Sequence, residues 1–164
     1  MPLLISDANI LIDMECGGLL HRMFDLAHQF AVLDVLFEEE LKAQHPELPA
    51  HGLQILELNE DGVSLGVQLI RDHGNRGASR NDLLSLALAQ QQDCPLLTGD
   101  RRLREICEDI GHGVNGTLWL MGEMHLARLI TPKQATDSYK SMEEQGRRLP
   151  WPQIRAQLKA MRGD

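Results

Sequence analysis

The sequence predicts an α/β protein with three layers, α/β/α, around a mainly parallel sheet of about five strands. Short apolar runs alternate with longer segments of helical periodicity, which is the pattern of βαβ units. Two of the short runs end directly at an acid, the first at Asp7 and a later one at Asp100. Because chemistry gathers at the carboxyl ends of parallel strands, we expect both acids at one edge of the sheet.

The expected elements follow one another in a regular order. Apolar runs bounded by turn residues predict strands at 2–6, 30–36, 53–58, 95–98 and 112–115. Apolar residues at helical spacing predict helices at 17–28, 37–43, 60–73, 79–92, 101–110, 116–128, 132–145 and 151–162. Residues 44–52 are expected to form a loop and residues 74–77 a turn. After Thr131 the pattern is helical alone, with a break at Pro150 and Pro152.

Composition and charge narrow the class of protein. With 43% hydrophobic and 24% charged residues, the 164-residue chain is typical of a soluble globular protein with a full core. Its three cysteines lack paired spacing, which predicts no disulfide or zinc site and fits a reducing cytoplasm. No signal peptide or membrane span is expected. A net charge of −8, which residues 1–82 account for, argues against a simple electrostatic nucleic-acid binder but suits acids that hold cations.

Three acids stand where a sheet edge would bring them together. Asp7 and Asp100 follow strands, and Asp82 opens the helix at 79–92. Each is also explained as a helix cap, since Asp is a preferred N-cap and Ser79 with Asp82 matches a capping box. Capping does not require all three at one edge, however, and clustered carboxylates repel one another unless protons or cations neutralise them. The acids therefore predict a site for Mg²⁺ or Mn²⁺, which prefer oxygen ligands.

A fourth acid is expected from the three consecutive glutamates that end at Glu40. Consecutive helical side chains point in different directions, so one or two of them at most face the site. Glu40, which precedes the apolar Leu41, is the first choice and Glu39 the second, with a solvated helical turn as the alternative. Asn9 and Thr98 stand beside the strand-end acids and can orient a carboxylate or a metal-bound water, although Thr98 is equally explained as a strand residue.

Taken in order, these motifs resemble the PIN domain family. The matching segments are Asp7 with Asn9, Glu40-Leu41, the helix that Asp82 opens, and Leu-Leu-Thr-Gly-Asp100. Asn115-Gly116-Thr117-Leu118 also resembles the short strand and helix start of many PIN proteins. The resemblance covers about residues 1–130, which are expected to form the PIN-like catalytic domain. Residues 131–164 would be a helical extension packed on the same domain, longer than a minimal toxin of this family needs.

The resemblance implies a divalent-metal-dependent endoribonuclease that hydrolyses RNA, and commonly the toxin of a toxin–antitoxin pair. Its acidic quartet would be Asp7, Glu40, Asp82 and Asp100. The three aspartates would hold Mg²⁺ or Mn²⁺, and Asn9 would fill the family's polar position after the first acid. The implied partner is a small antitoxin-like inhibitor protein that lays a segment, often with an Arg, across the acids.

Two further expectations concern binding surfaces. Arg80 and Arg101, which neighbour two of the acids in sequence, are expected to contact RNA phosphates, with a solvated helix face as the alternative. The apolar stretch at 118–121 either belongs to the core or offers a surface to a partner or a second copy. In the second case the chain would form a homodimer.

Two other interpretations of the acids remain open at this stage. A haloacid-dehalogenase-like phosphatase also places acids after its first strand and a late strand. However, Asn9 stands where that class needs a second Asp, and residues 43–132 contain no lysine. A PIN-like scaffold that binds RNA or protein without cutting it would keep the same fold without the activity.

Overall fold

A computed structural model describes residues 1–163 of the chain. Within them a five-stranded sheet has the order β3-β2-β1-β4-β5, and every neighbouring pair is parallel. The strands are β1 (Leu3–Ser6), β2 (Gln29–Leu33), β3 (Gln54–Leu56), β4 (Leu96–Leu97) and β5 (Val114–Asn115). The predicted α/β class is confirmed. The order reverses between β1 and β4, which is where open α/β sheets bind ligands at the strands' carboxyl ends.

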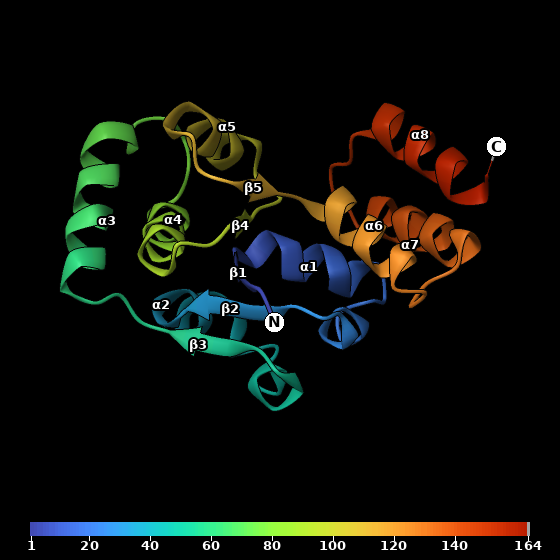
Figure 1. Cartoon of the computed structure of the whole chain (residues 1–164), viewed down its shortest axis with the longest axis horizontal. Coiled ribbons are helices and arrows are strands. Elements are labelled where there is room, and N and C mark those ends of the chain that lie inside the picture. The colour runs from blue at the N-terminus through green and yellow to red at the C-terminus, as the bar shows by residue number, and fades with distance from the viewer. Residues whose placement is uncertain (164) are drawn as a thin grey trace.

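Helices cover both sides of this sheet. They are α1 (Ala8–Cys16), α2 (Asp34–Leu36), α3 (Glu60–His73), α4 (Arg80–Gln92), α5 (Arg101–Ile110), α6 (Thr117–Leu126), α7 (Pro132–Glu144) and α8 (Trp151–Arg162). Figure 1 shows α3, α4 and α5 grouped at one side of the sheet and α1, α6, α7 and α8 at the other. No helix within residues 1–163 has both the length and the apolar character needed to cross a membrane.

The first helix begins earlier than the sequence predicted. A helix was expected over 17–28, but α1 spans Ala8–Cys16 and residues 22–25 form only a 3₁₀ turn. The Asp7 carboxylate accepts a hydrogen bond from the Ile10 N–H and caps α1 directly at the end of β1. The prediction was wrong because one residue connects strand and helix, so no loop signal separates them.

The second strand is shorter than predicted, because the apolar run at 30–36 is divided between a strand and a helix. β2 stops at Leu33, and the chain continues through α2 into a π-helical turn over Phe37–Leu41. Apolar runs this short do not distinguish strand from helix by periodicity alone. β3 is also narrower than its predicted range, and the expected loop contains a 3₁₀ turn over Leu48–His51.

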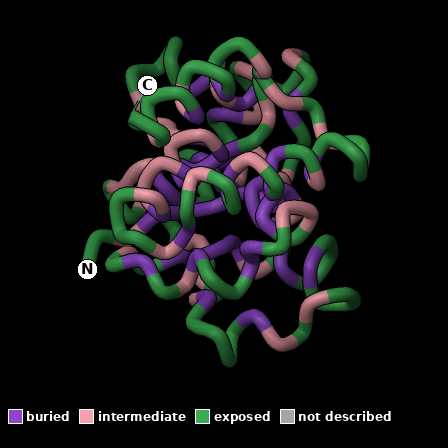
Figure 2. The backbone as a smooth tube through the Cα atoms, turned by 90° about the vertical axis from the view of Figure 1, so that its right-hand side faces the viewer, coloured by how far each residue is buried: buried purple, intermediate pink, exposed green. Residues whose placement is uncertain are grey.

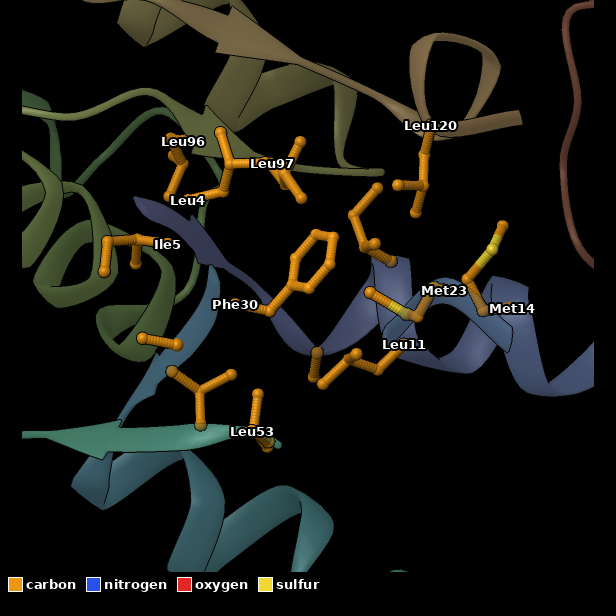
Figure 3. Close-up of a cluster of buried hydrophobic side chains, with 14 of the residues drawn as sticks. Leu4, Ile5, Leu11, Met14, Met23, Phe30, Leu53, Leu96, Leu97 and Leu120 are labelled. Atoms are coloured by element: carbon orange, nitrogen blue, oxygen red, sulfur yellow. The ribbon is translucent and has the colours of Figure 1, made fainter. Parts of the chain in front are cut away.

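The hydrophobic core is built around the central strands. Ile5 and Leu97 have no exposed surface, as is typical of a parallel sheet covered on both faces. Figure 2 shows buried backbone concentrated in the middle of the molecule. In Figure 3, Phe30 of β2 lies among apolar side chains from other elements, including Leu11 of α1 and Leu120 of α6. Helices distant in sequence therefore share one core with the sheet.

The apolar stretch at 118–121 lies mostly in this core. Leu120 and Met121 are fully buried, and Leu118 and Trp119 are half-buried. This stretch therefore offers little free surface to a second copy of the chain. The homodimer stays a prediction.

Specific hydrogen bonds join the C-terminal helices to the rest of the chain. The Ser141 hydroxyl of α7 donates to the Cys16 carbonyl at the end of α1 (2.6 Å). The fully buried Tyr139 donates its hydroxyl hydrogen to Gln157 Oε1 (2.5 Å), and Gln157 Nε2 donates to the Leu118 carbonyl (2.7 Å). Gln157 thus ties α8 to both α7 and α6, and we infer that residues 131–163 fold as part of the same domain.

Replacing the Tyr139 hydroxyl tests this junction. Tyr139→Phe should lower the free energy of unfolding by about 1–2 kcal/mol, because Gln157 Oε1 loses its donor in a place largely closed to water. Urea denaturation measures the change. In a Gln157→Leu background the same substitution should cost less than about 0.5 kcal/mol. An equal cost in both backgrounds would contradict the assigned hydrogen bond.

Candidate active site at the carboxyl edge of the sheet

Asp7 is the most deeply placed of the predicted acids. It follows β1 directly, and none of its surface is exposed. Its Oδ1 accepts the Ile10 N–H (3.0 Å), while Oδ2 accepts the Thr98 hydroxyl (2.5 Å) and the Gly99 N–H (3.3 Å). The residue therefore caps α1 and also binds the chain segment that leaves β4. The predicted helix cap is present, and the same side chain joins the ends of β1 and β4.

Burial changes the acidity of Asp7. Loss of hydration raises the pKa of its carboxyl group to about 7, and the negative charge of Asp82 contributes in the same direction. The hydrogen bonds from Thr98, Ile10 and Gly99 oppose this rise but do not cancel it. Without a nearby cation, the folded protein thus favours the protonated form of Asp7 below about pH 7.

Thr98 connects Asp7 to Asp100. Its hydroxyl donates to Asp7 and accepts the Asp100 N–H (3.0 Å), and its side chain is buried beyond the end of β4. Asp100 Oδ1 in turn accepts the Arg102 N–H (3.2 Å) and caps α5. The strand ends of β1 and β4 are therefore coupled through one hydroxyl group, which is a role beyond that of a strand residue.

Asp82 stands at the start of α4, and its carboxylate group interacts electrostatically with the other acids. It forms the predicted capping box with Ser79, in which Asp82 Oδ2 accepts the Ser79 N–H (3.3 Å) and Ser79 Oγ accepts the Asp82 N–H (3.1 Å). Burial raises the pKa of the Asp82 carboxyl group, and the charges of Asp100 and Glu40 raise it further. Two other segments of the chain thus bring negative charge close to Asp82.

The three consecutive glutamates separate in the structure. Glu38 pairs with Lys42 along the helix surface (3.2 Å). Asn81 Nδ2 instead donates to one carboxylate oxygen of Glu39 and one of Glu40, both at 2.9 Å. Since Asn81 precedes Asp82, this amide fastens the π-helical turn to the start of α4. Of the glutamates, Glu40 is the one whose charge acts on Asp82.

A polar cluster beside the acids was not foreseen from the sequence. Asp13 on α1 is almost fully buried, its Oδ1 accepts Arg147 Nε (2.6 Å), and its Oδ2 accepts the Thr117 hydroxyl (2.7 Å). Arg147 also donates to Asn9 Oδ1 (3.3 Å), so Asn9 contacts the C-terminal segment. Gly99 lies against this cluster, where an added Cβ would come within 3.1 Å of the Asn9 Cβ. A helix correctly started at residue 8 would have placed Asn9 and Asp13 on one face, four residues apart.

The arginines near the acids have different surroundings. Arg101 is exposed over 88% of its side chain and pairs with Glu105 (3.0 Å). Arg80 is exposed at the first turn of α4. Arg76, like Arg101, forms an ion pair at the surface, in its case with Asp109 (2.7 Å).

The donor set suits a water-rich cation site rather than an enclosed one. No group of three or more His, Cys, Asp or Glu side chains in residues 1–163 is arranged to surround a metal ion. Mg²⁺, however, keeps several waters and is commonly held by only one or two carboxylates. Asp82 and Asp100 each have one carboxylate oxygen that accepts no hydrogen bond from the described chain. The residues present therefore fit a hard divalent ion with water ligands.

Comparisons with known proteins agree with this fold. A family model described as a PIN domain matches residues 3–162, and no curated protein matches the chain. VapBC-1 from nontypeable Haemophilus influenzae is similar in structure, with 16% identity, a TM-score of 0.52, and coverage of 70% of this chain and 98% of that one. A Pyrobaculum aerophilum protein has 15% identity, a TM-score of 0.50, and coverage of 74% and 89%. A toxin–antitoxin complex from Klebsiella pneumoniae has 21% identity and coverage of 59% and 86%, but its TM-score of 0.43 is too low to support the fold.

The acidity of Asp7 predicts how stability depends on pH in the absence of metal. Because the folded-state pKa of about 7 lies above the ordinary 3.8, the folded state binds the extra proton, and stability falls as pH rises between these values. Asp7→Asn should flatten this fall and, at pH 8 in EDTA, raise the free energy of unfolding by about 2–4 kcal/mol. Urea denaturation at pH 5 and pH 8 measures both quantities.

Asp93→Asn is the matched control for this experiment. It removes the same charge at an exposed position whose left-handed backbone, with φ of +50°, suits asparagine. It should leave the pH dependence as in the parent protein. If Asp7→Asn and the parent lose stability equally between pH 5 and pH 8, the raised pKa of Asp7 is refuted.

Proposed function

This chain belongs to the PIN domain family, and we propose that it is a divalent-metal-dependent endoribonuclease that hydrolyses RNA phosphodiester bonds. The observation that supports this function is the convergence of acids on one edge of the sheet. Asp7, Asp82 and Asp100 come from three segments far apart in sequence, and Glu40 comes from a fourth. Asp7 and Asp100 follow the two strands between which the strand order reverses, where an open α/β sheet positions chemistry.

We propose that Mg²⁺ or Mn²⁺ binds among Asp7, Asp82 and Asp100, with Asp82 and Asp100 supplying the ligand oxygens. A bound divalent ion would supply a water of lowered pKa and neutralise charge on the phosphodiester. The carboxylate oxygens of Asp82 and Asp100 that accept no hydrogen bond are the ones open to ligation. Asp7 lies buried next to these acids, and its hydrogen bond with Thr98 also holds the segment that carries Asp100.

The remaining residues of the proposed site orient these groups. Glu40 is placed by Asn81 next to Asp82 and completes the acidic quartet. Asn9 and Thr98 act as positioning residues, one through Arg147 and the other through Asp7. The exposed Arg80 and Arg101 are proposed to contact RNA phosphates, and the reaction would take place in the cytoplasm, where RNA substrates are available.

We further propose that the chain acts as the toxin of a toxin–antitoxin pair. An acidic pocket is complementary to a basic segment, and an Arg guanidinium can pair with two carboxylate oxygens and compete with a cation for them. Residues 1–82 carry the excess negative charge that would attract such a segment. A small inhibitor protein with a basic segment is therefore the partner that suits the site.

Cleavage is the direct test of the proposed enzyme. The purified chain should cut single-stranded RNA with Mg²⁺ or Mn²⁺ and stop in EDTA. Asp100→Asn should slow cleavage by about 100-fold or more, the scale typical for loss of one catalytic group. Asparagine is also a good N-cap, so α5 should stay folded. Gel analysis of a labelled oligonucleotide measures the rate.

Two controls accompany this assay. Asp93→Asn removes an equal charge from an exposed position outside the site and should cleave like the parent. Millimolar Mn²⁺ should raise the melting temperature of the parent by mass action, and Asp100→Asn should reduce that rise. RNA cleavage that persists in excess EDTA, or that Asp100→Asn leaves unchanged, would show that the assigned site is wrong.

The toxin role predicts a phenotype in growing cells. Expression of the chain alone should arrest growth, and the product of an adjacent small reading frame should restore it, because a basic segment blocks the acids. Expression of Asp100→Asn should be harmless, which separates RNA cleavage from simple overproduction. Growth curves provide the measurement. If the parent cleaves RNA in vitro but never slows growth, the toxin role should be abandoned and the nuclease kept.

A further inference from the structure

A groove of about 1410 Å³ opens beside Thr98 and Asp100 and extends to the linker between α7 and α8. Residues of α5, the start of α6, and the linker around Arg148 line it. In Figure 1, α5 and the start of α8 both lie above the segment that joins β5 to α6, α5 over its β5 end and α8 over its α6 end. The C-terminal helices therefore contribute directly to the surroundings of Asp100.

The groove has more positive charge than its own acids neutralise. Arg101 is paired with Glu105, and Arg102 donates to the Gly77 carbonyl (3.4 Å). The side chains of Arg104 and Arg148 form no ion pair or hydrogen bond with the described chain. In a protein of net charge −8, unpaired arginines gathered beside Asp100 are complementary to an anionic ligand.

Gly116 makes room for one of these arginines. An added Cβ at this position would lie 2.5 Å from Arg104 Nη2, so the guanidinium group extends across the glycine at the start of α6. The same Cβ would lie 3.4 Å from the Thr98 carbonyl oxygen. The Arg104 guanidinium group is therefore close to the segment that carries Asp100, to which only the Arg104 backbone N–H is hydrogen-bonded, at the Asp100 carbonyl (3.0 Å).

Two adjacent arginines in the linker have opposite orientations. Arg147 is turned inward, where it bonds to the buried Asp13 and to Asn9 on α1. Arg148 is exposed and lines the groove. The first arginine thus anchors the linker to the helix that Asp7 caps, and the anchored linker presents the second arginine to the groove.

The groove also has apolar lining next to its arginines. Trp119, Leu149 and Pro150 all line it, and the first two are half-buried. Alternating cationic and apolar or aromatic groups match single-stranded nucleic acid, whose bases are free to stack while its phosphates bind arginine. A duplex keeps its bases stacked inside, so they cannot contact the apolar lining of the groove.

We propose that this groove binds single-stranded RNA, with Arg104 and Arg148 on successive phosphates and the apolar lining beneath an unstacked base. The C-terminal extension then forms part of the substrate site. This proposal rests on the proposed nuclease function for the identity of the ligand, whereas binding itself requires no cleavage. Since the groove leads to Asp100, a strand held in it would bring a phosphodiester to the acids.

A binding measurement without turnover tests the groove. A fluorescein-labelled single-stranded RNA of about 12 nucleotides, a length within the ~4–16-nucleotide sites of single-strand binders, is titrated with the full chain in EDTA while anisotropy is followed. Arg148→Ala and Arg104→Ala should each weaken binding by about 5- to 20-fold at low salt and reduce the slope of log K against log salt by about 0.7. Arg148→Lys should retain most of the affinity, because it keeps the charge.

The matched control is Arg155→Ala on α8. Arg155 is an exposed arginine of the same extension and does not line the groove, so its removal should leave binding unchanged. Equal affinities of Arg148→Ala, Arg155→Ala and the parent would overturn the proposal. So would tighter binding of a duplex RNA, or displacement of the RNA by an equimolar acidic peptide, which would identify a protein surface instead.

Failure of this proposal is distinguishable from failure of the nuclease function. If no metal supports cleavage but Arg148→Ala still weakens RNA binding relative to Arg155→Ala, RNA binding in the groove is supported and the nuclease function is refuted. If RNA is cleaved and Arg148→Ala changes neither KM nor binding, the nuclease function is supported and RNA binding in the groove is refuted.

Discussion

The hydrogen bond from the Thr98 hydroxyl to Asp7 is the contact on which the rest of the site depends. It joins the ends of β1 and β4, the strands between which the order of the sheet reverses. Because Asp7 is fully buried, water cannot solvate its carboxyl group, and three protein donors do so instead. The same threonine oxygen accepts the Asp100 N–H, so the placement of one acid determines that of the other.

Helix capping and the proposed chemistry use the same side chains. Asp7 caps α1, Asp82 completes the capping box of α4, and Asp100 caps α5. A cap holds its carboxylate against the first turn of a helix, which fixes the direction of the side chain. The two explanations that compete at the level of sequence therefore support each other in the fold, since local stability keeps the acids in place.

The C-terminal helices are coupled to the site through α1. Asp13 accepts hydrogen bonds from the Thr117 hydroxyl and the Arg147 guanidinium. These donors are separated from Asp13 by 104 and 134 positions along the chain. An ion pair this buried needs good geometry on both sides, because each charge has lost its hydration. The contact explains how an extension beyond the strands can help shape the groove next to Asp100.

Local patterns in the sequence determined much of this protein. Apolar periodicity predicted the parallel α/β class and most helices after residue 59, and the acids at strand ends predicted where Asp7 and Asp100 would meet, because these effects act within a few residues or follow from parallel strands. Only the tertiary structure decided the start of α1 and the roles of Asp13, Thr117 and the two linker arginines. Arg147 and Arg148 are chemically identical neighbours, and they differ solely in what packs against them.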